Sequence, residues 1–218
     1  MKRLLRSLLL CSLLTAPAVY SKAQFNMGAG LAFNTYKGKG YKKAHPALQA
    51  RLGYDLKSGK YFVNAGYNFS PSVGRTTAYF SLPNSSGIME EYYLQQQIRI
   101  NNAFLHFGYV LFPAENDFHL RLIFGASMDF INIGYEFDDN LPANFDKSWY
   151  SDTTMTGAKI DVGIGADFKI GSGKLFAELM LGLPANTVND MPYANPTVGH
   201  KGFIIGYSYY FGGRRDWY

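Results

Sequence analysis

Nucleophilic or acid–base catalysis in this chain would depend on its histidines, which are His45, His106, His119 and His200. A serine nucleophile needs a base within hydrogen-bond reach and a third group that orients that base. No histidine has a serine two positions after it, and His200 and Ser208 are separated by most of a predicted strand. We therefore predict no catalytic residues, and we predict that the protein is not an enzyme.

Cofactor and metal sites are equally poorly supported. The segment 171–174 (Gly-Ser-Gly-Lys) lacks the upstream glycine and the following Ser/Thr of a phosphate loop, and it joins two predicted strands. The single cysteine excludes a thiolate-rich metal site. Four acids could gather around a hard cation, but their irregular spacing favours a solvated acidic loop; they are Asp138, Asp139, Asp146 and Asp152. We predict no cofactor and no metal.

The first 23 residues have the pattern of a secretory signal peptide. A basic start precedes an apolar run that is shorter than the ~20 residues needed to span a bilayer, and small residues precede Gln24. We expect residues 1–23 to be the signal peptide and 24–218 to form one domain. Without the leader the chain carries 17 bases and 16 acids, which gives no support for nucleic-acid binding.

Period-two alternation of apolar and polar residues dominates the rest of the chain and predicts an all-β fold. No stretch after Gln24 holds 18 consecutive apolar residues. Eight strands are expected, with the phase blurred in the fourth; they cover 25–33, 48–56, 61–69, 93–112, 118–130, 158–170, 175–183 and 203–211. Short connections follow the second, fourth and sixth strands, whereas the other connections are long and polar; these are 37–45, 71–90, 138–152 and 185–199.

Alternation alone does not say which face is the core, because a soluble lipocalin-like barrel has the same period. Aromatic residues gather near the strand ends, as an interfacial girdle requires. The polar faces mix ions with mid-strand glycines, which suits a narrow packed lumen. We therefore predict an eight-stranded antiparallel up-and-down transmembrane β-barrel with short periplasmic turns and longer extracellular loops.

The last predicted strand carries a motif of its own. Gly206, Tyr209 and Phe211 match the glycine-x-x-aromatic-x-aromatic ending that outer-membrane proteins present to the barrel-assembly machinery, although Ile204 replaces a commonly polar residue and a tail follows. The chain after residue 23 resembles the small eight-stranded outer-membrane β-barrel family, which includes the OmpA-type membrane domain and PorT-like proteins. This resemblance implies a monomer in the cell outer membrane of a Gram-negative bacterium, surrounded by lipid and lipopolysaccharide.

With the apolar faces toward lipid, the predicted interior holds a network of ions. Its members are Arg51, Asp55, His119, Arg121, Asp129, Lys159, Asp161, Asp167, Lys169 and Glu178. Because buried ions need partners, the near-balance of acids and bases predicts internal pairing. Opposed residues in an antiparallel pair have a constant sum, and a sum of 288 would oppose Arg121 to Asp167, Asp129 to Lys159 and Gly125 to Gly163.

Two of the long loops could make surface contacts. A basic loop could bind lipopolysaccharide phosphates, and its lysines are Lys37, Lys39, Lys42 and Lys43. Trp149 and Tyr150 could anchor an unidentified protein partner. A solvated charge run and an interfacial aromatic pair are the alternatives, and both remain open.

The resulting functional hypothesis is an outer-membrane barrel with a plugged polar interior and a structural or surface-interaction role through its loops. Three alternatives stay open: a narrow porin-like channel, a lipid A-modifying enzyme like some similar small barrels, and an accessory component of protein secretion, which only the PorT-like resemblance suggests.

Overall fold

The computed structural model describes residues 24–37, 44–56, 60–71, 74–84, 86–111, 117–143, 145–148, 150–185 and 197–211. The expected signal peptide lies outside these residues. Within them, no helix is long and apolar enough to cross a membrane. The described residues form nine strands: β1 (Gln24–Lys37), β2 (His45–Asp55), β3 (Tyr61–Phe69), β4 (Gly74–Pro83), β5 (Met89–Val110), β6 (Phe118–Phe137), β7 (Thr153–Ile170), β8 (Gly173–Pro184) and β9 (Thr197–Tyr210).

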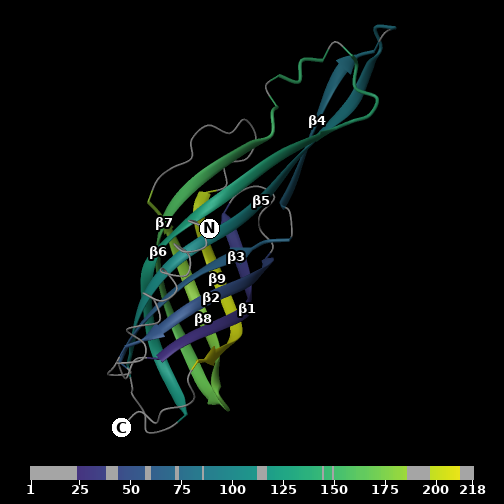
Figure 1. Ribbon diagram of the computed structural model, residues 1–218. Helices are drawn as coiled ribbons and strands as arrows, with labels where there is room; N and C mark the ends of the chain where they lie inside the picture. The colour runs from purple at the N-terminus through teal and green to yellow at the C-terminus, as the bar shows by residue number, and fades with distance from the viewer. Residues whose placement is uncertain are drawn as a thin grey trace, which may run out of the picture.

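Eight of these strands close into a ring. Each neighbouring pair is antiparallel, β3 pairs with β5, and the first and last strands pair along most of their length. The ring therefore has no free edge, and both described ends of the chain lie beside the short turns (Figure 1). The predicted all-β, eight-stranded, up-and-down barrel is confirmed.

β4 lies where the sequence predicted a loop, in segment 71–90. It pairs with the first half of β5, which begins at Met89 rather than near Tyr93. β3 and β4 pair with successive halves of β5 along the same edge. β4 therefore continues the line of β3 beyond the ring and does not add a ninth strand to it. The segment was expected to be a loop because it is a long polar connection, but its β-forming threonines and aromatics complete a strand once β5 supplies the partner.

Together β4, the first half of β5 and the end of β6 form a three-stranded extension that projects beyond the ring (Figure 1). We call it the arm, and it includes the described residues of the β6–β7 connection. One face of its sheet is covered by that connection, where the rings of Phe80 and Phe145 stack at 5.3 Å and Phe137 meets Tyr150 at 5.7 Å. The arm therefore has a small aromatic core of its own.

Apolar and charged side chains lie on the opposite faces of the wall from those of a soluble barrel. Ile160 and Ile164 are each 56% exposed on the outside, whereas Asp161 and Asp167, on the opposite face of β7, are 2% and 4% exposed. The apolar side chains therefore point outward and the charged ones inward, as the alternation predicted for a membrane barrel.

Large interior side chains lie over glycines of neighbouring strands. A Cβ at Gly108 would overlap the ring of Phe62, and one at Gly206 would overlap the ring of Phe176 and the backbone of β1. The mid-strand glycines therefore provide the space that these rings occupy inside a narrow barrel.

The predicted register of β6 against β7 is wrong by two residues. The paired positions sum to 286, so Arg121 lies opposite Gly165, Asp129 opposite Gly157 and Gly125 opposite Asp161. A long or charged side chain thus faces a glycine, which relieves crowding in the lumen, and each ion reaches its partner diagonally. The sequence argument counted only directly opposed residues and missed this geometry.

The observed register can be tested with engineered cysteines, since the described residues contain none. Ala126→Cys with Ile160→Cys joins directly opposed positions and should form a disulfide on mild oxidation. Ala126→Cys with Val162→Cys is the matched control, which should stay reduced. Gel mobility with and without reductant reports the outcome. Cross-linking of the control pair alone would contradict the observed register and support the predicted one, in which opposed positions sum to 288.

Closure of the ring can be tested by electrophoresis of the detergent-solubilised protein. A hydrogen-bonded wall without an edge resists unfolding in mild detergent, so the unheated sample should migrate differently from the boiled one. Identical migration of both samples would contradict a closed barrel.

Candidate functional site

Charged side chains fill the lumen at two levels. The level nearer the short turns contains six ions, which we call the turn-side cluster: Arg51, Asp55, Arg121, Asp167, Lys174 and Glu178. They project from β2, β6, β7 and β8. Three cations face three anions, so the cluster is balanced without any contribution from solvent.

Glu178 is the centre of the turn-side cluster. Its Oε1 accepts hydrogen bonds from Arg51 Nη1 at 2.7 Å and from Arg121 Nη2 at 3.0 Å. Arg121 Nε also lies 3.4 Å from Asp167 Oδ2, and Lys174 Nζ lies 3.5 Å from the same oxygen. One carboxylate therefore bridges two guanidinium groups, and a second links an arginine to the lysine.

The edges of this cluster are held by groups from other strands. Lys174 Nζ lies 3.0 Å from Asp55 Oδ2, and the hydroxyl of Tyr210 donates a 2.6 Å hydrogen bond to that oxygen. The Arg51 guanidinium lies 3.1 Å from the centroid of the Phe176 ring, within cation–π distance. The aromatic ring that occupies the space above Gly206 therefore also supports a charge.

The second level, nearer the long loops, is a chain of hydrogen bonds that we call the loop-side relay. It runs through Gln49, Asn68, Asn102, Asp129, Lys159 and His200. The Lys159 ammonium donates to Asp129 at 2.6 Å and to His200 Nδ1 at 2.9 Å. The six residues come from six strands, and the first four lie directly opposite one another on adjacent strands, so the relay follows the inner wall from strand to strand.

A histidine–aspartate pair lies beside the relay. His106 Nε2 is 3.1 Å from Asp161 Oδ2, and both side chains are buried. The His106 ring also stacks on Phe104 with centroids 4.6 Å apart. This histidine is therefore held by an acid and an aromatic ring.

Apolar layers separate and cap the charged levels. One buried cluster includes Phe62, Ile123, Phe176 and Met180 in the barrel. The other contains Tyr36, Ile98, Ile100, Ile131 and Ile133, and it lies on the loop side of the relay along β5 and β6. Solvent from the long-loop end meets this second cluster before it meets Asp129 or Lys159.

The ten residues predicted for the interior differ in their placement. Eight are buried, whereas His119 and Lys169 are only half-buried. Sequence reasoning assigned Lys174 to a turn, although Lys174 has the same phase as Glu178 on β8 and lies inside. It weighed His106 and His200 as catalytic bases and not as members of a hydrogen-bonded network, and their contacts in the lumen come from residues of other strands.

His200 and Ser208, the histidine and serine weighed from the sequence as a catalytic pair, lie at different levels of the lumen. His200 accepts from Lys159 in the loop-side relay, whereas Ser208 accepts a 3.2 Å hydrogen bond from Arg51 Nε at the turn side. Among the described residues there is no group of three or more side chains that could hold a metal ion.

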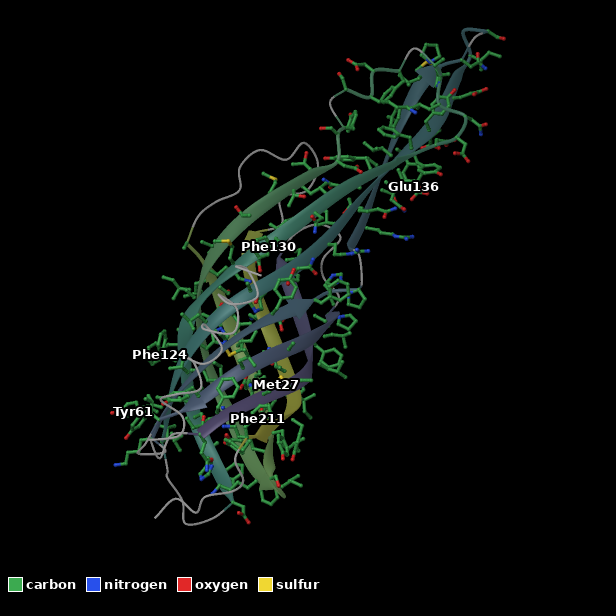
Figure 2. The ribbon with its side chains drawn as sticks, viewed as in Figure 1. Met27, Tyr61, Phe124, Phe130, Glu136 and Phe211 are labelled. Carbon is green, nitrogen blue, oxygen red and sulfur yellow. The ribbon has the colours of Figure 1, made fainter. Side chains whose placement is uncertain are left out.

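The residues of the predicted insertion signal lie on β9 and just after it. Gly206 faces Gly30 of β1, while Tyr209 and Phe211 are about half exposed on the outer surface. Phe211 contacts Tyr209 and Phe25, each with ring centroids 5.7 Å apart. These rings form part of an aromatic group at the turn end of the barrel, where Met27 of β1 lies opposite Tyr209 (Figure 2 labels Met27 and Phe211).

Of the residues predicted for surface contacts, Lys39, Lys42, Lys43 and Trp149 lie outside the described residues. Lys37 is the last residue of β1. Tyr150 is half-buried in the arm and packs against Tyr135, Phe137 and Phe145, so its ring stabilises the arm itself.

Tyr92 lies on the covered face of the arm. Its hydroxyl donates a 3.0 Å hydrogen bond to Glu90 Oε2. Desolvation of the phenol, followed by this hydrogen bond, raises the pKa of Tyr92 above its ordinary value. The hydroxyl therefore stays protonated and donates its hydrogen bond within the arm.

Comparison with known proteins agrees with this architecture. The family model for the outer membrane protein beta-barrel domain matches residues 5–211. The chain belongs to this family of outer-membrane β-barrel proteins. No curated protein matches the sequence.

The solved structures that resemble this chain are distant in sequence. A major outer membrane protein from Thermus thermophilus is 13% identical, with a TM-score of 0.59 over 87% of this chain and 99% of that one, and it supports the fold alone. The N-terminal β-barrel domain of Pseudomonas aeruginosa OprF is 12% identical, with a TM-score of 0.49 and the same two coverages. Ail of Yersinia pestis, solved with the heparin analogue sucrose octasulfate, is 11% identical, with a TM-score of 0.48 and the same two coverages.

Membership of this family places the protein in the cell outer membrane. The short turns are therefore periplasmic, and the arm and long connections are extracellular. The outward apolar belt contacts lipid and lipopolysaccharide.

The pairing of Lys159 with Asp129 can be tested by removing the cation. Lys159→Met leaves the carboxylate of Asp129 buried without its ammonium, which should lower the free energy of unfolding by about 3–5 kcal/mol. Urea titration in lipid vesicles, read by the heat-dependent gel shift, measures the change.

Two further variants make the result specific. Lys169→Met, at a half-buried lysine of the same strand, should cost less than about 1 kcal/mol. Adding Asp129→Asn to Lys159→Met should recover much of the lost stability, because no unpaired charge then remains. Equal losses for Lys159→Met and Lys169→Met would contradict the pairing.

Proposed function

We propose that this outer-membrane barrel is a closed, non-conducting scaffold that presents an extracellular arm for surface contacts. The observation that carries the proposal is the turn-side cluster, in which Arg51 pairs with Glu178 and Asp55 pairs with Lys174. These pairs join β2 to β8 inside the barrel, although β1 and β9 separate the two strands in the wall. A solute passing along the axis would have to break these pairs.

Charge pairing makes the turn-side cluster costly to open. Arg51 and Glu178 are each 3% exposed, and separating buried partners leaves uncompensated ions in a poorly solvated space. The loop-side relay lines the inner wall at a second level, where Lys159 pairs with Asp129. Eight strands enclose a space that side chains nearly fill, so the cluster leaves little room for a water-filled path.

The arm supplies the surface for contact. β4 pairs with β5 over ten residues, which corresponds to about 30 Å of strand. Tyr79 is 69% exposed, and Ile88 and Met89 near the tip are each 64% exposed. An ordered extension with its own aromatic core holds these side chains away from the membrane, as a contact surface requires.

Planar-bilayer recording tests the closed lumen. The wild-type protein, inserted in the barrel form shown by the gel shift, should give no steady conductance. Arg51→Ser with Glu178→Ser removes one cation and one anion from the turn-side cluster and preserves its charge balance, and it should raise the current above that of the wild type. Steady conductance by the wild type would contradict the plug and favour the narrow channel.

A further inference from the structure

We propose that the outward face of the arm binds the saccharide chain of the glycolipid that surrounds the barrel in the outer leaflet. This inference rests on the proposed role of the arm as a contact surface and names its ligand. The outward face is the side of the arm's sheet opposite the aromatic core. It presents Thr77, Tyr79, Tyr93, Gln95, Gln97 and Glu136.

The outward face is an ordered polar surface. Tyr79 lies directly opposite Tyr93, and Thr77 lies directly opposite Gln95. Gln97 Nε2 donates a 2.7 Å hydrogen bond to Glu136 Oε2 on the neighbouring strand. Side chains from three strands therefore form one flat surface, held in place by hydrogen bonds between strands and by the aromatic core behind the sheet.

The same face continues downward into the lipid-facing belt. Along β6, Glu136 shares the outward phase with Phe130 and Phe124, which Figure 2 labels in succession from the arm to the barrel wall. Along β5, Gln97 and Leu105 share that phase, and Leu105 is 45% exposed in the belt. A glycolipid whose acyl chains contact the belt therefore has its saccharide beside the outward face.

The chemistry of the face suits a saccharide. Amides and hydroxyls can donate to and accept from sugar hydroxyls, and an exposed tyrosine ring offers a flat apolar surface to the C–H face of a pyranose. The face carries Arg75 and Arg99 together with Glu91 and Glu136, and Asp152 lies beside Gly134. It therefore has no excess of bases. A polyanion would need an excess of bases, so we expect recognition of sugar hydroxyls rather than of phosphate or sulfate groups.

Gly134 leaves a shallow gap in this surface. It lies opposite Gln97, and a Cβ added there would meet only Asp152 Oδ1, at an ordinary 3.6 Å. A larger side chain would fit on the strand without overlapping the backbone. The position can therefore be used to obstruct the face without disturbing the fold.

The test uses the full chain in nanodiscs and the polysaccharide released from the bacterium's own lipopolysaccharide by mild acid, which contains no lipid A. Isothermal titration calorimetry should detect binding by the wild type. Tyr79→Ala and Gln97→Ala should each raise Kd about tenfold, the loss expected for one contact of this size. Gly134→Leu should raise Kd to a similar extent, because the added side chain obstructs the outward face.

Asn140→Ala is the matched control, because it removes an exposed amide from the connection outside the outward face. It should leave Kd unchanged, and all four variants should keep the gel shift of a closed barrel. Unchanged affinity in the three face variants, or an equal loss in Asn140→Ala, would overturn the proposal.

Two other outcomes would also overturn it. Binding only to intact lipopolysaccharide or to lipid A would assign recognition to the phosphates or acyl chains. A captured protein that depends on Tyr79 and Gln97, without polysaccharide binding, would retain the arm as a contact surface but change its ligand. The proposal of a closed lumen is tested separately, by the conductance of the wild-type protein.

Discussion

Burial of charge inside a narrow barrel is the constraint on which the rest of this structure depends. Outward apolar faces leave the ions no bulk water, so each must find a partner among the other interior side chains. Glu178 meets this need by bridging Arg51 and Arg121, and Asp129 does so through Lys159 and Asn102. Because these partners come from different strands, the pairing also ties the wall together across its interior.

The positions of the interior glycines and of the charged side chains depend on each other through packing. Phe62 and Phe176 need the space over Gly108 and Gly206, and the guanidinium groups of Arg121 and Arg51 then lie over those two rings. A direct opposition of two long ions would crowd the same space, so the ion pairs between β6 and β7 run diagonally across glycine positions. Packing of side-chain volume, rather than attraction between opposed charges, sets this register.

The arm shows how the alternation that builds the barrel continues outside the membrane with different chemistry. Its inward phase becomes an aromatic core closed by the β6–β7 connection, and its outward phase changes from leucine and phenylalanine to amides, tyrosines and charges without an excess of bases. The change occurs near Arg99 and Asn132, where the belt ends. An extended polar sheet of this kind supports the proposed role in surface contact.

The sequence by itself determined the strand periodicity and the alternation of short and long connections, because both follow from local spacing along the chain. It also indicated the direction in which Ile160 and Asp161 point, because aromatic residues gather at the strand ends and the polar faces mix ions with glycines. It could not determine the register of β6 and β7, the interior position of Lys174, or the relay that includes His200. Those depend on which strands meet and on which side chains fill the space over a glycine. Likewise, β4 is a strand only because β5 extends far enough to pair with it, which no local pattern records.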